Sequence, residues 1–473
     1  MAMHLFRPGR RLGWLRHASV ALLAVGCSHL TDPLLQAHDP DNIPAGATQS
    51  IAGAEGLRLG ALYRLVTITA GADTAGKESI WLWGGYLTDE WKSGDTFAQR
   101  IGADSRSVPN ADPINERVYR DLQRARLTSD QAVAALQTYK PTAKGEIGEM
   151  YFVKAYTLIQ LAESYCNGQA LGSYDDQGKL IYGDMVTNDA LYQMAVTATD
   201  AGLAALGTAS DALSASARNA LRITKARALT DLKQYAAAAT AVSTVPTDYV
   251  YQVTFKNSSI INNIWELNVA EARYVVGDSV DAAGRLRNAL PFFSAGDPRV
   301  PTDVGGRAFD SSTPWVGQLI WSKDGPNQGD EDPVAVVNGI DARLYESEAQ
   351  LAAGDIVGWL ATLNALRLGP TKVSDAVTIG GPVGDVLPPL VDPGTPAGRI
   401  SLQFREKAFW TYGRGERLGD LRRLVRQYGR PQDQVFPTGT FFKGGAYGTD
   451  VNLPVPQAEL NNPTYKGCID RSA

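Results

Sequence analysis

Histidine is nearly absent from this sequence. Only four histidines occur, and the last of them is His38. Catalysis by Ser-His-Asp or Cys-His arrangements and the usual histidine-based zinc sites are therefore excluded for the body of the chain. The body also lacks the side chain most used for proton transfer near neutral pH. Glycoside hydrolysis by a pair of carboxylates stays open, because it needs no histidine.

Basic clusters and long apolar runs are missing as well. The formal net charge is −5, and without the four arginines of the first 26 residues it becomes −5 − 4 = −9. An acidic chain with no basic block is a poor partner for nucleic acid. No later segment reaches the about 20 consecutive apolar residues that a membrane span needs. We therefore expect a body that neither binds nucleic acid nor crosses a membrane.

The first 26 residues have the pattern of a signal peptide. Four arginines precede a short apolar run, Val20–Val25, which ends at Gly26 and Cys27. A basic start, a short apolar stretch and small residues before a cleavage site are typical of secretory signals. Small residues directly before a cysteine favour a lipidation site, so we expect residues 1–26 to be removed and Cys27 to carry lipid. An ordinary secretory signal with an unrelated cysteine is the alternative.

The residues that follow predict a lipid-anchored tether. Segment 27–46 is rich in Asp, Pro, Ala and Asn, and Ser28 rather than aspartate follows the cysteine. A serine at this place favours the outer membrane in a bacterium with two membranes. We therefore expect a protein of the cell outer membrane that is lipid-anchored and exposed at the surface.

Two cysteines remain beyond the anchor, Cys166 and Cys468. Outside the cytoplasm, two such thiols most simply form one disulfide. This bond would join the end of a helix in the first half of the chain to the C-terminus, and would stabilise the fold by about 3–5 kcal/mol. Two unpaired buried thiols are the alternative.

Helical periodicity dominates the body. Apolar residues recur at helical spacing in five segments, which predict helices. These are Ser50–Thr67, Pro113–Leu136 (one or two helices), Thr142–Tyr165, Asn188–Leu206 and Ser214–Leu232. Segments 217–246 and 339–368 further resemble the helical hairpins of tetratricopeptide repeats, which need stacked neighbours to bury their apolar faces. Unrelated hairpins, the alternative, would still be helical packing.

Between the hairpins the sequence changes character. Segment 248–268 predicts short strands, and 270–338 and 370–400 are rich in Gly, Pro, Asp and Ser. Loops of this length in a compact protein are usually functional. The predicted fold is mainly α, with tetratricopeptide-like helical repeats, long loops and a few short β-strands. We divide it into an N-terminal helical-repeat region, 47–247, and a C-terminal region with ligand loops and the remaining helices, 248–473.

Motifs in the C-terminal third carry a resemblance to a known family. Residues 405–410 and 413–423 look like a signature helix, and 453–463 look like a closing motif; weaker matches occur at 296–299, 341–349 and 148–156. In this order, the motifs resemble those of the SusD/RagB family of outer-membrane nutrient-uptake lipoproteins. The sequence departs from the family at Lys154, where arginine is usual, and in its pair of cysteines.

The resemblance implies a function without catalysis. Members of this family capture a nutrient at the cell surface, often an oligosaccharide and sometimes a peptide, and cap a TonB-dependent (SusC-like) transporter. It also implies four helical repeats that face the transporter and ligand contacts from loops outside the repeats. The charged residues of the signature segment alternate in sign at near-helical spacing, which favours a structural role through charge-assisted hydrogen bonds.

Aromatic residues in two segments suggest where a ligand binds. Sites of this kind are concave pockets with a few placed polar groups. Segments 81–95 and 313–321 combine tryptophan or tyrosine with such groups. The candidate ligand-binding residues are Tyr86, Asp89, Trp91, Trp315 and Trp321. Alternation places Trp81 and Trp83 on one inward face, and regular apolar patterns place Trp265, Trp359 and Trp410 in the core. The alternative is that all these tryptophans are core, because aromatic side chains dominate buried area.

Two other functions stay open at this point. A surface glycoside hydrolase would use two carboxylates, such as Glu346 and Glu348. A helical-repeat scaffold would bind no small ligand. We expect no catalytic residue, no cofactor and no recognisable metal site, although surface Asp and Asn side chains could hold a structural calcium ion.

Overall fold

The computed structural model describes residues 49–71, 76–175, 179–278, 287–380 and 386–473. The predicted signal peptide (1–26), the predicted lipid site at Cys27 and the tether (27–46) lie outside the described residues and stay predictions. Residues Thr48–Ala473 cluster as a single unit. None of the described helices is long and apolar enough to span a membrane.

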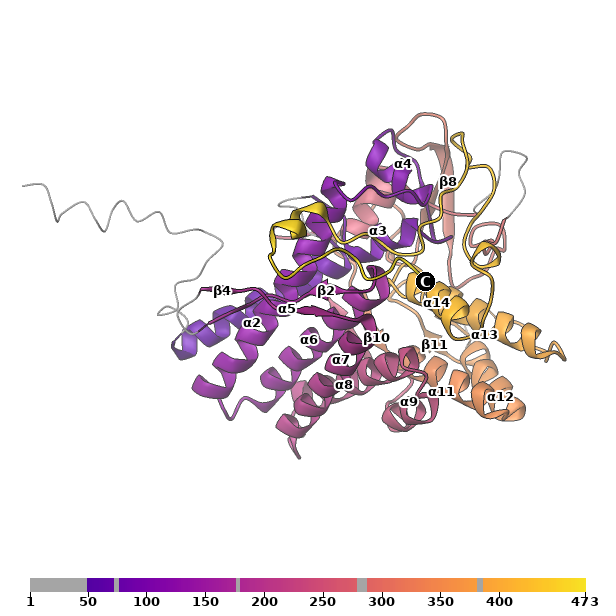
Figure 1. The fold of residues 1–473 in the computed structure, drawn as a ribbon. Coiled ribbons are helices and arrows are strands. Elements are labelled where there is room, and N and C mark those ends of the chain that lie inside the picture. The colour runs from indigo at the N-terminus through magenta and orange to yellow at the C-terminus, as the bar shows by residue number, and fades with distance from the viewer. Residues whose placement is uncertain (1–48, 72–75, 176–178, 279–286, 381–385) are drawn as a thin grey trace, which may run out of the picture. The chain divides into compact units, whose positions relative to one another are not determined.

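Among the described residues, four helical hairpins form the framework (Figure 1). In chain order they pair α2 (Ile51–Thr69) with α5 (Pro113–Tyr139), α6 (Lys144–Ser164) with α7 (Asn188–Leu206), α8 (Ala212–Asp231) with α9 (Tyr235–Val242), and α11 (Gly339–Ala353) with α12 (Ile356–Leu368). Contacts of α5 with α6, of α6 with α8 and of α9 with α11 stack each hairpin on the next. The predicted mainly α fold with tetratricopeptide-like repeats is confirmed.

Local sequence sets the ends of these helices. The Ser50 hydroxyl accepts a backbone amide hydrogen bond and caps α2. Helix α5 begins with Pro113, whose missing amide proton costs nothing in a first turn. Asn338 and Asp341 form a reciprocal capping box at the start of α11. The same helix ends at Gly354 with φ of 78°, a left-handed conformation that favours glycine.

Small residues allow the hairpins to approach closely. Ala226 and Ala228 on α8 are fully buried, as expected for positions where two helices meet. A Cβ atom on Gly202 of α7 would lie 2.8 Å from the Cβ of Tyr151 on α6. No larger side chain therefore fits at this crossing unless the helices move apart.

Three short elements lie between α2 and α5, namely α3 (Ile80–Tyr86), β1 (Trp91–Ser93) and α4 (Ala98–Asp104). The alternation that placed Trp81 and Trp83 on one face is wrong as local structure, because both residues belong to helix α3. The Ser79 hydroxyl accepts an amide hydrogen bond in the first turn and starts this helix. Both tryptophans are nevertheless fully buried, as predicted.

Short antiparallel strand pairs occur outside the hairpins. The longer pairs are β1 with β7 (Tyr274–Val276), β6 (Val250–Val253) with β10 (Val334–Asn338), and β8 (Thr302–Arg307) with β9 (Pro314–Gln318). The smaller pairs are β2 (Gln169–Ala170) with β5 (Met185–Val186), β3 (Ser173–Tyr174) with β4 (Leu180–Ile181), and β11 (Thr371–Lys372) with β12 (Thr378–Ile379). Strand β6 confirms a strand in 248–268. That segment also contains α10 (Asn263–Trp265), which continues into the π-helix η1 (Glu266–Ala270).

The segment predicted as one signature helix is two helices, α13 (Pro396–Trp410) and α14 (Arg417–Arg426). The turn between them contains Gly413 and Gly415, both with φ of 68°. A Cβ atom on Gly415 would also collide with the indole of Trp81. A continuous helix is therefore excluded by a turn that only glycine accommodates well. Two 3₁₀ turns follow, η2 (Gln432–Gln434) and η3 (Gln457–Asn461).

The closing segment returns to the first half of the chain. The Leu453 carbonyl accepts the amide hydrogen bond of Cys166, directly after the end of α6. A disulfide joins Cys166 to Cys468, 302 positions apart in sequence. The predicted pairing of the two cysteines is confirmed, and it covalently connects the C-terminus to the second hairpin.

Candidate functional site

A pocket lies among the loops outside the hairpins. Its walls come from the β1 segment, α4, the β8–β9 turn and a loop near the C-terminal end of the chain, and α4 and β8 lie at the opposite end of the view from α9 and α12 (Figure 1). Its volume is about 690 Å³, within the range of about 300–1,000 Å³ that is typical of small-molecule sites. The lining residues are Lys92, Asp95, Thr96, Ile101, Asp310, Ser312, Thr313, Pro314, Phe442 and Lys443.

Phenylalanine side chains lie in and beside this pocket. Phe442 lines it, and Phe97 and Phe309 are chain neighbours of lining residues. Phe97 is 49% exposed and Phe309 is 44% exposed. The guanidinium of Arg273 lies 3.7 Å from the ring centroid of Phe309 and 5.1 Å from that of Phe97. These cation–π contacts hold two apolar rings at the surface, where a ligand can stack on them.

The two carboxylates of the pocket wall are paired with cations. Asp95 accepts hydrogen bonds from Arg100 at 2.6 Å and from Arg273 at 2.8 Å. Asp310 accepts one from Lys443 at 2.5 Å. Burial opposes ionisation of Asp95, but the hydrogen bonds from Arg273 and from a backbone amide outweigh it and lower its pKa. Burial also opposes ionisation of Asp310, but its hydrogen bonds, above all the one from Lys443, outweigh this effect and lower its pKa. Both carboxylates are therefore held as anions.

Lys92 differs from the other charged residues of the wall. Its ammonium nitrogen lies 4.0 Å from the ring centroid of Phe442, and within the described part of the chain it forms no ion pair. Partial burial lowers the pKa of Lys92, although Asp104, Asp278 and Asp310 favour the charged form. The pocket thus contains one cation whose donors are not used by the described residues.

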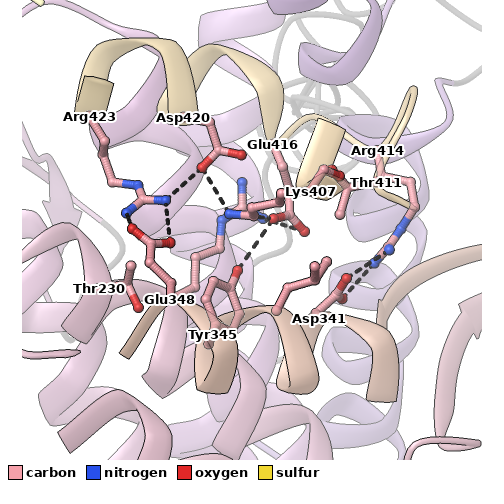
Figure 2. A network of polar contacts seen from close by, with 12 residues as sticks. Thr230, Asp341, Tyr345, Glu348, Lys407, Thr411, Arg414, Glu416, Asp420 and Arg423 are labelled. Carbon is pink, nitrogen blue, oxygen red and sulfur yellow. Dashed lines mark hydrogen bonds and ion pairs between the residues drawn. The ribbon is translucent and has the colours of Figure 1, made fainter. Parts of the chain in front are cut away.

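A second group of charged residues lies in the interior, between α11, α13 and α14. Figure 2 shows Lys407 of α13 between Glu416 and Asp420, at 3.1 and 2.8 Å. Arg423 of α14 pairs with Glu348 of α11 at 2.5 Å and with Asp420 at 2.8 Å. Opposite charges on three helices therefore pair in the buried interior. These pairs connect α11 of the fourth hairpin to the C-terminal helices α13 and α14.

The turn before α14 extends this network. Arg414 donates two parallel hydrogen bonds to Asp341, at 2.8 and 2.7 Å (Figure 2). Burial opposes ionisation of Glu416, but the charges of Lys407, Arg227 and Arg414 outweigh it and lower its pKa to about 2. These contacts agree with the structural role predicted for the signature segment.

The carboxylates Glu346 and Glu348 do not form a catalytic pair in this structure. Two residues apart on α11, they do not share a helix face. The side chain of Glu348 is 1% exposed and bound to Arg423, whereas Glu346 pairs with Arg343 at the surface. Within the described ranges, no group of three or more His, Cys, Asp or Glu side chains could hold a metal ion.

Solved structures resemble this arrangement, although no protein-family model and no curated protein matches the sequence. A SusD-like protein from Bacteroides fragilis has 14% sequence identity and a TM-score of 0.62, over 90% of this chain and 98% of that chain. This chain has a SusD-like fold. The resemblance to the SusD/RagB family that the motifs suggested is thus confirmed at the level of the fold.

Two further proteins with the SusD-like fold are described by what they bind. One is a laminarin binding SusD-like protein, with 13% identity and a TM-score of 0.60, over 89% of this chain and 99% of that chain. The other is surface glycan-binding protein A from Bacteroides uniformis, with 10% identity and a TM-score of 0.58, over 88% and 99% of the two chains.

Four of the predicted ligand-binding residues lie in the interior of the SusD-like body, so the exposure expected for them is wrong. Tyr86, Asp89 and Trp91 are fully buried, and Trp321 is 2% exposed. Asp89 accepts two hydrogen bonds from Arg417, at 2.7 and 2.8 Å. In this structure these four side chains are packed in the core and expose no surface to a ligand.

Aromatic packing explains the burial of Tyr86 and Trp91. The Tyr86 ring stacks on Tyr274 with centroids 4.1 Å apart, and the Trp91 ring lies 5.2 Å from that of Tyr412. A Cβ atom on Gly85 would lie 2.5 Å from Trp91, so only glycine leaves room for the indole in the core. Large aromatic surfaces gain more free energy in this interior than at a loop tip.

Trp315 is half-buried, and its indole nitrogen donates to the Asn268 carbonyl at 2.7 Å. The pocket contacts its neighbours Thr313 and Pro314 instead. Both predicted segments therefore reach the pocket, through residues other than the aromatic ones that we selected. Phe442 was missed, because the only local signal is a Phe-Phe-Lys run with glycine after it.

Proposed function

We propose that this protein is a surface lipoprotein that captures a glycan in the pocket and caps a TonB-dependent (SusC-like) outer-membrane transporter, without catalysis. The observation that carries the proposal is a pocket in the loops, flanked by exposed phenylalanine rings, in a chain with the SusD-like fold. Sugars have apolar ring faces edged by hydroxyl groups. Rings such as Phe309 and Phe442 match the ring faces, and the charged and hydroxyl side chains of the wall match the hydroxyl groups.

Relatives in structure support a glycan as the ligand. One protein of this fold is described as laminarin binding and another as a surface glycan-binding protein. A peptide ligand, which the family resemblance also implies, would need main-chain donors and acceptors along an extended groove. A pocket lined mostly by charged and hydroxyl side chains, with phenylalanine rings in and beside it, favours the glycan.

The charge state of the pocket supports binding without hydrolysis. Glycoside hydrolysis needs one carboxyl group that can donate a proton and a second that is ionised. Asp95 and Asp310, the carboxylates of the wall, are both held as anions by cationic partners. Neither is suited to the role of the acid.

The position of the hairpins supports a partner at the repeats. The helical hairpins and the pocket are formed by different parts of the chain. A transporter can therefore contact the repeats while the pocket stays open to a ligand. Lipid on Cys27 and the tether 27–46 would keep the body beside that transporter, and both rest on the sequence alone.

Binding to glycan and peptide arrays, with and without Phe442→Ala, tests the capture. We expect glycans to bind, and Phe442→Ala to weaken binding about tenfold, because a stacked ring contributes on the order of 1 kcal/mol or more. Tyr182→Ala is the matched control, since Tyr182 is 46% exposed but does not line the pocket. Release of shorter glycans would overturn the non-catalytic assignment, and binding of peptides alone would overturn the ligand class.

Affinity purification from membranes of the producing cell tests the partner and the anchor. We expect a large TonB-dependent transporter to co-purify with the intact protein, and Cys27→Ala to release the protein from the membrane fraction. Purification without a transporter at any ionic strength would refute the capping role, while glycan capture could still stand.

A further inference from the structure

We infer that the pocket selects glycans that carry an anionic group, a carboxylate or a sulfate, and that Lys92 binds this group. The inference rests on the proposed function and names the substrate class. It is argued from the charge balance of the pocket wall, from the placement of Lys92 by its strand, and from the ring beside it.

The first observation is the charge balance of the wall. Asp95 pairs with Arg100 and Arg273, and Asp310 pairs with Lys443. Lys443 also donates to the Asp95 carbonyl at 2.6 Å. Each carboxylate therefore has its cation, and the ammonium group of Lys92 remains without an ion pair among the described residues. A ligand meets one uncompensated positive charge there.

The second observation is how the strand places Lys92. In β1 it lies between Trp91 and Ser93, both fully buried, and its register partner on β7 is Val275. Successive side chains of a strand point to opposite faces, so Lys92 lies on the face opposite to Trp91 and Ser93, where it is half-buried and lines the pocket. The strand pairing thus presents this ammonium group to the pocket rather than to the core.

Neighbouring acids do not take the place of an ion-pair partner. Asp104 lies beneath β1, is 2% exposed, and accepts the Ser93 amide hydrogen bond at 2.6 Å. Burial raises the pKa of Asp104 to about 7, which weakens it as a counter-ion. Asp278 accepts the backbone amides of Phe293 and Ser294. These acids stabilise a protonated Lys92 from a distance and leave its hydrogen-bond donors for a ligand.

The third observation is a ring that lies close to both lysines. The ammonium nitrogens of Lys92 and Lys443 lie 4.0 and 5.7 Å from the ring centroid of Phe442. A sugar that stacks its apolar face beside this ring brings its substituents close to Lys92. A carboxylate or sulfate there gains a charge-assisted hydrogen bond, about twice as strong as a neutral one to a hydroxyl group. It also offsets the cost of burying an unpaired cation.

Calorimetry with three oligosaccharide probes of equal length tests this inference on the purified protein. The probes are an oligogalacturonate with carboxylates, a sulfated galactan without carboxylates, and an unsubstituted galactan. We expect at least one anionic probe to bind about tenfold or more tightly than the neutral one. The affinity for the anionic probe should fall as salt is added. The first two probes distinguish a carboxylate from a sulfate as the preferred group.

Lys92→Gln is the decisive variant, because it removes the charge, keeps a hydrogen-bond donor and shortens the side chain by only one atom. It should remove the preference for the anionic probe, so that the variant binds the anionic and the neutral probe with affinities within about twofold of each other. Lys372→Gln is the matched control, since its side chain is 57% exposed and lies outside the pocket; it should keep the preference. Thermal melts of both variants exclude loss of folding as the cause.

Each result decides the inference separately from the proposed function. Equal affinity for neutral and anionic probes, with loss of binding in Phe442→Ala, would overturn the anionic specificity and leave glycan capture standing. A preference that survives Lys92→Gln would overturn the role of Lys92. Tight binding of an acidic peptide, with no oligosaccharide bound, would overturn both the inference and the glycan assignment.

Discussion

Glu90→Gln should make the stability of the protein less sensitive to pH. Glu90 is fully buried beside Trp91, and its Oε1 accepts the Gly413 amide hydrogen bond at 3.0 Å. Its Oε2 has no hydrogen-bond partner in the described structure. Burial raises the pKa of Glu90 from 4.5 to about 8, against the opposing effects of the Gly413 hydrogen bond and of Arg417. The folded protein therefore favours the protonated side chain.

The size of the effect follows from proton linkage. Below pH 4.5 the Glu90 carboxyl group is protonated in both the folded and the unfolded protein, and does not change the free energy of unfolding. Between 4.5 and about 8 the unfolded chain ionises while the folded one keeps its proton, so the free energy of unfolding falls by about 1.4 kcal/mol per pH unit. Above that range the loss reaches a maximum of about 5 kcal/mol. A glutamine at this position does not titrate, so it adds no pH dependence to the free energy of unfolding. Its side-chain oxygen can still accept the Gly413 amide hydrogen bond.

Urea unfolding at several pH values, followed by tryptophan fluorescence, measures the difference between Glu90→Gln and the wild type. We expect similar free energies of unfolding near pH 4.5 and a variant that is several kcal/mol more stable near pH 8. Glu331→Gln, at an exposed position, serves as the control and should follow the wild type. A constant difference across the whole range would show that Glu90 is ionised in the folded protein, and would refute the reasoning.

The remaining predictions concern ion pairs and the disulfide. Arg414→Met leaves the buried carboxylate of Asp341 without its bidentate partner. We expect this change to lower the free energy of unfolding by about 3–5 kcal/mol. Arg399→Met breaks a pair of the same geometry with Asp392 at the surface, and should have no measurable effect on urea unfolding. Equal effects of the two would contradict the argument from burial. Replacing Cys166 and Cys468 together by serine should lower the stability by about 3–5 kcal/mol, seen as a lower melting temperature. An unchanged melting temperature would mean that the bond does not form.

Local patterns in the sequence predicted most of the helical framework. The first hairpin helix was expected from Ser50 and begins at Ile51, and the segment Asn188–Leu206 has the same bounds in sequence and structure. These helices depend on apolar spacing, caps and short turns, which are all properties of neighbouring residues. Helix α3 was missed because Trp81 and Trp83 alternate as in a strand, and its few residues are too short for a helical period to show.

Long-range partners could not be predicted. The motifs that contain Glu348, Arg414 and Arg423 were found in the sequence, but which acid meets which base depends on how α11 and α14 pack. The same holds for Trp91 and Trp315: a glycine-bounded aromatic has the same local sequence whether it stacks in the interior or lies at the surface.

The sequence by itself determined where most of the hairpin helices lie, that no histidine acts in the body of the chain, and that Cys166 and Cys468 are available to pair. The absence of histidine after His38, the helical periodicity and the number of cysteines are properties of composition and near neighbours. The pocket is decided by the tertiary structure alone. Lys92, Asp310 and Lys443 come from three distant parts of the chain, and Lys443 joins two of these parts by donating to Asp310 and to the Asp95 carbonyl. Whether a lysine has a counter-ion depends on that folding, because an ion pair forms only where two separate segments meet.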